Sequence, residues 1–360
     1  MKILNLVDHL LHGGVQRMAV NIANELPKYE IESHLSTILQ DGELRPLVQD
    51  TVHYFSLSAD KIFSPLAVRK LHAYCKENKI EVIHAHHKAL YLASQVSFID
   101  KNIKLVWHDH YGRQQYRQRP WLLYYFLTRP VDRVISVSRS LQNWAIESMK
   151  IPKENVKFIP NFIDFSEEIE ELELSLPGKP GKRIVCVANF RPHKDHFTLL
   201  KGFKNLSLTH PDAHLILVGQ VEDQEYFERV EEEIQQLHLE NHVTNLGKRM
   251  DVHAILRSSD IGLLSSASEG LPLVLIEYGH ARLPVLCTDV GDCSWIIEDK
   301  KRGIIIPPGK PDDLSSGLVT LLDDPQQAQY YANNLKAFVD RHLNKKAVVE
   351  KVIDLYKSCL

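Results

Sequence analysis

The chain has 360 residues, of which 44% are hydrophobic and 25% charged, with 43 lysines and arginines against 46 aspartates and glutamates. This composition excludes a collagen, a coiled coil or an intrinsically disordered chain. Five cysteines without a Cys-x-x-Cys spacing argue against a disulfide framework or a cysteine zinc site. We therefore expect a protein of a reducing compartment, folded as two domains of roughly 150 residues each.

The beginning of the chain gives no sign of export. Its apolar stretch is interrupted by Asp8 and His9, so it predicts a first strand rather than a signal peptide. No uncharged run approaches the roughly 20 residues that a membrane span needs. We expect a cytoplasmic protein, for which the inner face of the cell membrane is a further place of contact.

The first half of the chain has a net positive charge and the second half a net negative one. Residues 1–165 contain 21 lysines and arginines and 16 acids, a net charge of +5. The remaining residues contain 22 lysines and arginines and 30 acids, a net charge of −8. Such an asymmetry indicates that the two halves meet different partners. No recognised nucleic-acid-binding motif accompanies the positive charge, so nucleic acid is not an expected partner.

Segment 113–139 combines arginines with aromatic side chains. Its six arginines face a single acid, Asp132, and they flank an aromatic stretch that contains Trp121 and Tyr125. This composition is typical of a helix at a membrane interface, where arginines meet anionic headgroups and aromatic rings meet the acyl boundary. The alternative is an ordinary buried helix with solvated basic ends.

Short apolar runs alternate with segments of helical period throughout the first half. The apolar runs predict strands at residues 2–7, 33–39, 52–57, 82–86, 104–108, 133–138 and 156–160. The helical spacing predicts helices at residues 15–26, 64–77, 88–98 and 140–149. Strands that alternate with helices in this way indicate a mostly parallel sheet with helices on both faces.

Residues 164–182 interrupt this alternation. Acidic side chains followed by two Pro-Gly pairs predict an interdomain linker. After the linker, strands are predicted at residues 183–189, 214–219, 243–247, 260–266, 284–289 and 303–308. The economical fold class is α/β, with two doubly wound Rossmann-like domains that face one another across a cleft and bind ligands outside the carboxyl ends of their strands.

The most specific motif lies at residues 268–291, directly after a predicted strand. Glu269 and Gly270 occupy the loop, and Pro272 suits the first turn of a helix, where a missing N–H costs nothing. Glu277 follows about one and a half turns later. The loop and the helix together therefore offer two carboxylates at different depths.

The start of the predicted helix also offers an anion site. The backbone amides of Leu273 and Val274 lack intrahelical acceptors, and they lie beside Glu269. Glu277 lies deeper, within an apolar stretch where an unpaired carboxylate would be costly. The alternative for Glu277 is a solvated surface glutamate.

This pattern resembles that of glycosyltransferase family 4, whose members are retaining nucleotide-sugar transferases of the GT-B fold. The resemblance covers nearly the whole chain and is strongest over residues 183–309. It implies that Glu269 contacts hydroxyls of the donor sugar, with Gly270 and Leu271 in the same loop. It also implies that Glu277 binds the ribose hydroxyls, since a carboxylate can accept two hydroxyl hydrogens.

Other residues of the second half resemble the family's donor site. The segment 187–195 supplies Arg191 and Lys194, similar to the pair that neutralises the donor diphosphate as the sugar bond breaks. Gly219 and Lys248 correspond to the region where the family holds the nucleotide base. The base is left open by these residues, and the family's range slightly favours a UDP-sugar. The alternative for the two basic residues is a pair of solvated side chains.

The first half carries candidates for the acceptor side. Gly13 and Gly14 resemble the family's Gly-Gly loop, where the backbone approaches donor phosphate and acceptor, although a plain tight turn is the alternative. His108 resembles the family histidine close to the reacting sugar, against the alternative of a buried structural histidine. The remaining candidates on the acceptor side are His86, His110 and Arg113.

The resemblance implies a retaining hexosyltransferase that needs no metal ion and no cofactor beyond its nucleotide-sugar donor. Lysine and arginine at the phosphate position would do the work of a divalent cation. The histidine spacing would permit a metal, but a closed zinc site needs further ligands that the sequence does not place. We expect a glycan acceptor, first of all a lipid-linked diphosphate glycan of capsule, exopolysaccharide or lipopolysaccharide synthesis, and second a soluble sugar or small metabolite.

The expected domains are an acceptor-binding domain at 1–163, the linker at 164–182 and a nucleotide-sugar-binding domain at 183–343. The helix predicted at 344–360 is expected to pack back on the first domain, as the last helix of GT-B proteins commonly does. Two other functions fit the same fold: a sugar-nucleotide epimerase, and a non-catalytic nucleotide-sugar-binding subunit. The complete set of Glu269, Glu277 and Lys194 argues against a degenerate site.

Overall fold

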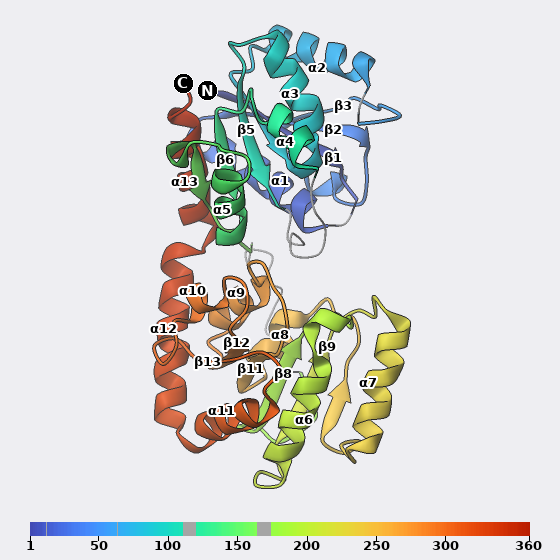
Figure 1. Cartoon of the computed structure of the whole chain (residues 1–360), viewed down its shortest axis with the longest axis vertical. Coiled ribbons are helices and arrows are strands. Elements are labelled where there is room, and N and C mark those ends of the chain that lie inside the picture. The colour runs from blue at the N-terminus through green and yellow to red at the C-terminus, as the bar shows by residue number, and fades with distance from the viewer. Residues whose placement is uncertain (12, 63, 111–119, 164–173) are drawn as a thin grey trace. The chain divides into compact units, whose positions relative to one another are not determined.

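The computed structural model describes the whole chain except residues 12, 63, 111–119 and 164–173 (Figure 1). The chain divides into two compact units. The first comprises Met1–Phe162 together with Lys345–Leu360, and the second comprises Ile163–Asn344. Of the linker predicted at 164–182, residues 164–173 lie outside the described residues. Each unit has a parallel sheet with helices packed against it, which confirms the predicted α/β class.

The sheet of the first unit has the strand order β3-β2-β1-β4-β5-β6-β7, and the paired strands are parallel. The strands are β1 (Lys2–His9), β2 (Glu32–Gln40), β3 (His53–Ser56), β4 (Val82–His86), β5 (Lys104–Asp109), β6 (Arg133–Ser136) and β7 (Val156–Phe158). The helices are α1 (Gly14–Glu25), α2 (Pro65–Asn78), α3 (Leu90–Ile99), α4 (Trp121–Leu127), α5 (Arg139–Glu147) and α13 (Lys345–Lys357). Each strand predicted in this half overlaps an observed strand.

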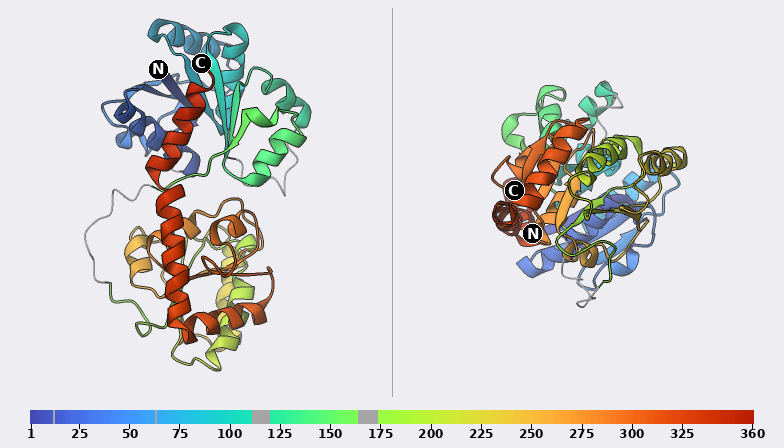
Figure 2. Two further views of the ribbon diagram at one scale, coloured as in Figure 1. Left: turned by 90° about the vertical axis from the view of Figure 1, so that its left-hand side faces the viewer. Right: turned by 90° about the horizontal axis from the view of Figure 1, so that it is seen from below.

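Helices cover both faces of this sheet, and its strands are accordingly apolar on both sides. In β1, Leu4 and Leu6 pack into the core shared with α2 and α3. Ile3 points to the opposite face, where it packs with Met18 of α1 and Val348 of α13. The last helix of the chain therefore completes the core of the first unit, and Figure 2 shows α13 beside that sheet.

The sheet of the second unit has the order β10-β9-β8-β11-β12-β13, again with parallel pairs. The strands are β8 (Arg183–Val187), β9 (His214–Val218), β10 (Val243–Asn245), β11 (Ile261–Leu264), β12 (Val285–Thr288) and β13 (Ile304–Ile306). The helices are α6 (His196–Ser207), α7 (Gln224–Gln236), α8 (Val252–Arg257), α9 (Leu273–His280), α10 (Cys293–Ile297), α11 (Pro311–Asp323) and α12 (Pro325–His342).

Each sheet has one place where the strand order reverses. This switch point lies between β1 and β4 in the first unit and between β8 and β11 in the second. Loops leave such a point in opposite directions, which opens a crevice at the carboxyl ends of the strands. Ligand-binding residues are therefore expected directly after these four strands.

Tyr278 anchors α9 to the second sheet by hydrogen bonds to β8 and β11. Its buried hydroxyl donates a hydrogen bond to the carbonyl oxygen of Leu263, at 3.1 Å, and accepts one from the backbone N–H of Val187, at 3.0 Å. An added Cβ at Gly262 would come within 2.6 Å of the Tyr278 ring, so only a glycine leaves room for it. The helix that carries Glu277 is thereby held at a defined position over β8 and β11.

Candidate functional site

The switch point of the second sheet brings two predicted motifs together. β8 is followed by the loop that carries Arg191 and Lys194, and β11 is followed by the loop that carries Ser266 and Glu269. The two strands are adjacent and parallel, so both loops leave the same edge of the sheet. Residues 75 positions apart in the sequence thus meet at one place.

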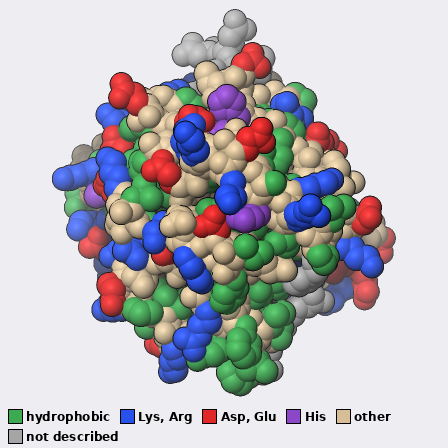
Figure 3. Space-filling model, turned by 90° about the horizontal axis from the view of Figure 1, so that it is seen from above, with side chains coloured by type: hydrophobic (Ala, Val, Ile, Leu, Met, Phe, Trp, Pro, Cys, Tyr) green, Lys and Arg blue, Asp and Glu red, His purple; other side chains and the backbone are tan. Residues whose placement is uncertain are grey.

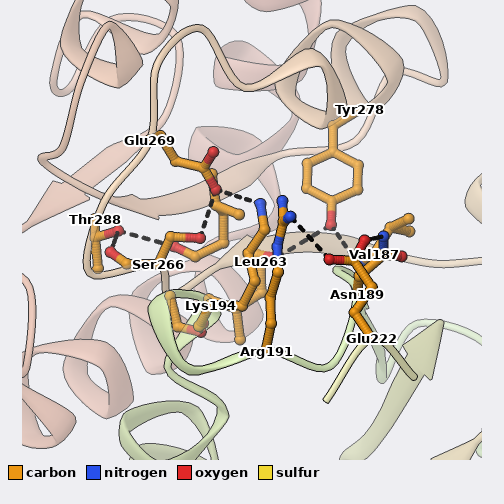
Figure 4. A network of polar contacts seen from close by, with 12 residues as sticks. Val187, Asn189, Arg191, Lys194, Glu222, Leu263, Ser266, Glu269, Tyr278 and Thr288 are labelled. Atoms are coloured by element: carbon orange, nitrogen blue, oxygen red, sulfur yellow. Dashed lines mark hydrogen bonds and ion pairs between the residues drawn. The ribbon is translucent and has the colours of Figure 1, made fainter. Parts of the chain in front are cut away.

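Lys194 and Glu269 form an ion pair at this edge. The Lys194 ammonium donates to Glu269 Oε1 at 2.5 Å, and the Ser266 hydroxyl donates to the same oxygen at 2.7 Å (Figure 4). Thr288 donates to the Ser266 carbonyl at 2.6 Å and holds that residue in place. The side chains of Lys194 and Glu269 are only 12% and 11% exposed. A charge pair so far removed from water needs such hydrogen bonds to offset its desolvation.

The two loops are also tied through their backbones. The N–H of Ala267 donates to the carbonyl of His193 at 2.8 Å, and the Ser265 hydroxyl donates to the carbonyl of Lys194 at 3.0 Å. These bonds fix the distance between the loops independently of the ion pair. The ammonium and the carboxylate are therefore positioned before any ligand binds.

Gly291 supports the Glu269 loop from the other side. Its backbone has a φ of +58°, and an added Cβ would come within 2.5 Å of the carbonyl oxygens of Glu269 and Gly270. The next residue, Asp292, donates its backbone N–H to the carbonyl of Gly270 at 2.8 Å. The last glycine of the predicted motif is thus required by the conformation of the loop, a role that its spacing in the sequence did not reveal.

The carboxylate of Glu277 makes no hydrogen bond or ion pair with any residue that the structure describes. It lies on α9 and is partly buried. Desolvation by burial raises the pKa of this carboxyl to about 7. A partly buried carboxylate without a partner is typical of a site that a ligand completes.

The N-terminus of α9 lies between the two glutamates in the sequence. The helix begins at Leu273. Pro272 is its N-cap, so it lies one residue before the first turn in which the sequence analysis placed it. The backbone amides of Leu273 and Val274 are therefore in the first turn, where no intrahelical acceptor exists. They can receive an anion as the sequence predicted.

Arg191 has a partner that the sequence did not indicate. Its Nη1 donates to Glu222 Oε2 at 2.9 Å, and the Asn189 amide donates to the other Glu222 oxygen at 2.5 Å (Figure 4). Glu222 follows β9, the strand beside β8, and its place after a strand was the available signal. The buried Nε of Arg191 has no partner among the described residues. The guanidinium is thus held by Glu222. Arg191 meets Lys194 only through the backbone in the described structure, where the N–H of Lys194 donates to the carbonyl of Arg191 at 3.0 Å.

Gly219 is explained by backbone packing. An added Cβ would lie 2.1 Å from the carbonyl oxygen of Ala188, so β8 and β9 can pass into their loops only with a glycine here. Its N–H donates to the carbonyl of Gly247 at 3.0 Å. Lys248, the next residue, is exposed. The segments that follow β9 and β10 in the predicted base-binding region are thus joined by a backbone hydrogen bond.

Four histidines gather at the carboxyl ends of β4 and β5 in the first unit. His84 and His86 lie two residues apart on β4, and His86 pairs in register with His108 of β5. His84 Nε2 and His108 Nδ1 share a hydrogen bond of 3.1 Å, and His86 Nδ1 and His110 Nε2 share another of 3.1 Å. His108 and His110 are stacked with ring centroids 3.9 Å apart.

Burial keeps this cluster neutral. Desolvation lowers the pKa of His84 to about 3, and it lowers the pKa of His86, His108 and His110 well below the ordinary range. Neutral imidazoles can ligate metals, and ring nitrogens of His84, His86 and His108 lie within 4.8 Å of one another. These three residues could hold a metal ion, although all of their ring nitrogens except His108 Nε2 are here engaged in hydrogen bonds with described residues.

The remaining acceptor-side candidates differ in what the structure says of them. An added Cβ at Gly14 would meet nothing within 4 Å, so local packing does not require a glycine there. Gly13 precedes α1 as its N-cap, and an added Cβ would meet only the flexible end of Gln16. Arg113 lies outside the described residues. Both ring nitrogens of His86 have partners, so none is left for an acceptor.

Comparison with known families agrees with this geometry. The family described as Glycosyltransferase Family 4 matches residues 12–167, and the one described as Glycosyl transferases group 1 matches residues 169–338. The chain belongs to glycosyltransferase family 4. The resemblance noted in the sequence is thereby confirmed.

Curated relatives of this family 4 glycosyltransferase match along most of their length. N-acetyl-alpha-D-glucosaminyl L-malate synthase of Bacillus anthracis is 26% identical over 86% of this chain and 83% of the relative. An Escherichia coli UDP-Gal:alpha-D-GlcNAc-diphosphoundecaprenol alpha-1,3-galactosyltransferase is 22% identical over 96% and 94%. Among solved structures, HepE of Anabaena in complex with UDP and glucose is 23% identical and has a TM-score of 0.80. The match covers 99% of this chain and 100% of the HepE chain. Its similarity supports the GT-B fold.

The aromatic segment of this glycosyltransferase lies on the surface. In α4, Trp121, Leu122 and Phe126 are each more than half exposed, whereas Tyr124 is buried. The interpretation as an ordinary buried helix is therefore wrong. Figure 3 shows hydrophobic side chains gathered along the lower edge of the visible face, with lysines and arginines beside them. None of the helices in the described part of the chain is long and apolar enough to cross a membrane.

Proposed function

We propose that this glycosyltransferase moves a hexosyl unit, with retention of configuration, from a nucleotide-diphosphate sugar to a glycan acceptor of cell-surface polysaccharide synthesis. A UDP-sugar is the favoured donor, because the similar HepE structure contains UDP. A lipid-linked diphosphate glycan is the favoured acceptor, because the Escherichia coli relative acts on a diphosphoundecaprenol-linked sugar.

The observation that carries this proposal is the ion pair of Lys194 and Glu269 at the switch point of the second sheet. The Lys194 ammonium has further protons for the donor diphosphate, and Arg191 and the amides of Leu273 and Val274 add to the positive potential. Glu269 Oε2 has no hydrogen-bond partner among the described residues, so it can accept from a sugar hydroxyl. In this proposal, the loop backbone at Gly270 and Leu271 lies beside the same sugar.

The proposed reaction needs no nucleophile from the protein. The bond between the anomeric carbon and the diphosphate oxygen breaks, and the acceptor oxygen attacks the same face of the sugar. The acceptor hydroxyl gives its proton to the leaving phosphate oxygen, which balances the step. The protein supplies preorganised positive charge where negative charge develops. The proposed route therefore differs from that of a retaining glycosidase, in which a carboxylate forms a covalent intermediate.

A transfer assay with labelled nucleotide sugars tests this proposal. A donor is first selected by thermal shift, because a ligand that binds the folded state raises its stability. NMR of the product then reads the anomeric configuration, and an inverted product would contradict retention. Epimerisation of the sugar nucleotide without acceptor would indicate the epimerase, and binding without turnover would indicate a non-catalytic subunit.

We expect transfer to be independent of divalent cations, since Lys194 and Arg191 supply the positive charge. Incubation with EDTA is expected to change kcat by less than about twofold. Added Mg²⁺ or Mn²⁺ serves as the matched control. A loss of turnover that Mn²⁺ restores would show that a metal ion carries the diphosphate charge.

A lipid-linked acceptor places the reaction at the cytoplasmic face of the membrane. α4 suits this position because its apolar side chains are exposed beside Arg129, whose guanidinium lies 4.1 Å from the ring centre of Tyr125. An exposed aromatic patch with adjacent positive charge favours the interface of an anionic bilayer.

We expect this protein to float with anionic vesicles and less with neutral ones. Replacing Trp121 and Phe126 by serine is expected to lower binding at least about tenfold, since burying each ring contributes roughly 1.5–3 kcal/mol. Leu66→Ser is the control, because Leu66 is 61% exposed on α2 of the same unit. Equal flotation of the double variant and the control would contradict the role of α4.

A further inference from the structure

A hydrogen-bonded chain connects the last helix of the protein with His108. The hydroxyl of Tyr356, on α13, lies 2.5 Å from His84 Nδ1, and His84 Nε2 lies 3.1 Å from His108 Nδ1. All three side chains are buried. The chain ends at His108 Nε2, which is buried without a hydrogen-bond partner among the described residues.

The chemistry of these groups sets the direction of the chain. A neutral imidazole has one N–H donor and one acceptor nitrogen. If Tyr356 donates to His84 Nδ1, then His84 carries its proton on Nε2 and donates to His108 Nδ1. His108 must then carry its own proton on Nε2. This direction leaves one unsatisfied group, the Nε2–H of His108.

The opposite direction leaves more buried groups unsatisfied. His84 Nδ1–H would donate to the Tyr356 oxygen, and the phenol hydrogen would lose its acceptor in the described structure. His108 Nε2 would become a bare acceptor as well. Each buried polar group without a partner costs free energy. Burial also raises the pKa of Tyr356 well above its ordinary value, so the phenol keeps the proton that it donates.

A second chain runs beside the first and serves as an internal reference. The Oδ1 of Asn5 lies 3.2 Å from His86 Nε2, and an amide oxygen can only accept. His86 therefore carries its proton on Nε2 and accepts at Nδ1 from His110 Nε2. Tyr356 takes no part in this chain, although the rings of His84 and His86 are stacked at 4.2 Å.

We propose that Tyr356 and His84 are positioning residues that hold His108 in the tautomer with its proton on Nε2, so that His108 presents a neutral N–H donor to an oxygen of the substrate. Such a histidine cannot accept the proton of an acceptor hydroxyl at that nitrogen, so it acts as a hydrogen-bond donor and not as a general base. The role of His108 toward substrate rests on the proposed function, whereas its tautomer does not. The last helix of the chain thereby takes part in the site of the first unit.

The tautomers can be measured without any substrate. In protein with 15N-labelled histidine, long-range 1H–15N spectra distinguish protons on Nδ1 from protons on Nε2, and single histidine variants assign the signals. We expect His84 and His108 of the unaltered protein to carry Nε2–H. In Tyr356→Phe both directions leave two groups unsatisfied, so the Nε2–H form of His108 is expected to fall to about half. His86 is expected to stay unchanged.

Tyr74→Phe is the matched control. The Tyr74 hydroxyl lies 2.7 Å from His34 Nδ1, so the same kind of pair is broken in the same unit but outside the cluster. In a transfer assay, Tyr356→Phe is expected to lower kcat about two- to tenfold with an unchanged donor KM, and Tyr74→Phe to lower neither. If His108 kept its proton fully on Nε2 in Tyr356→Phe, as it should in Tyr74→Phe, the proposal would be overturned. This outcome does not depend on the reaction that the enzyme performs.

A second pair of variants tests the proposal if Tyr356→Phe does not fold. His84→Gln keeps an N–H that can donate to His108 Nδ1, and His84→Leu, of similar volume, does not. We expect Nε2–H on His108 in His84→Gln and a mixture in His84→Leu. An Nδ1–H form of His108 in the unaltered protein would overturn the proposal. So would a stoichiometric metal ion lost from both His84 variants, because a metal would replace the proton between the two rings.

Discussion

Replacing Lys194 by methionine is expected to lower kcat about 10²–10³-fold, the usual cost of removing one preorganised charge from a transition state. Lys194 is held at 2.5 Å from Glu269 in a nearly buried pair. In the proposed reaction its ammonium faces the leaving diphosphate. Methionine keeps the length of the side chain and removes its charge. Steady-state kinetics with the selected donor would give kcat and KM separately.

Lys201→Met is the matched control, because Lys201 also loses a charge in the second unit but is 57% exposed, 3.8 Å from Glu233. Its kcat is expected to stay normal. Arg191→Met is expected to cost less than Lys194→Met, since Glu222 already neutralises much of the arginine. Normal turnover of Lys194→Met would show that another group carries the diphosphate charge.

Stability must be separated from catalysis in this experiment. Removing one partner of a buried pair leaves the other charge uncompensated, at a cost of about 3–5 kcal/mol where burial is complete. The double variant Lys194→Met/Glu269→Gln removes both charges. It is expected to recover much of the stability but none of the turnover.

The strands and the switch-point motifs were predictable from the sequence, because parallel strands covered on both faces are continuous apolar runs. β4 and β5 are examples, with strand ends marked by His86 and Asp109. Loops after such strands converge by topology, so Lys194 and Glu269 could be assigned to one edge before their contact was known.

The partners of these residues were not predictable in the same way. Tyr356 meets His84 across 272 residues, and the helical pattern of α13 identifies a buried tyrosine but not the atom that it contacts. Glu222 is one of several acids after β9, and only the fold places it against Arg191. Gly219 was predicted to lie in the base-binding region, and its close approach to Ala188 adds a requirement of backbone packing that the sequence did not indicate.

Replacing Glu277 by glutamine is expected to stabilise the ligand-free protein at pH 8 while weakening donor binding. The pKa of this carboxyl is raised from 4.5 to about 7 by desolvation, with no compensating partner in the described structure. A raised folded-state pKa means that the contribution of Glu277 to stability is fully present below pH 4.5 and is lost as the pH rises through 7. At pH 8 the ionised carboxylate therefore destabilises the fold by up to about 3 kcal/mol, which glutamine removes.

The same carboxylate is expected to hold the ribose of the donor, through hydrogen bonds of about 1.5–3 kcal/mol each. Donor affinity of the unaltered protein should therefore fall about tenfold per pH unit below 7, as Glu277 takes up a proton. In Glu277→Gln the affinity should be at least about tenfold lower at pH 8 and nearly independent of pH. Chemical denaturation and calorimetric titration between pH 5 and 8 measure both quantities, with exposed Glu225→Gln as control. A variant that is less stable at pH 8 yet binds donor normally would show that Glu277 supports the fold and not the ligand.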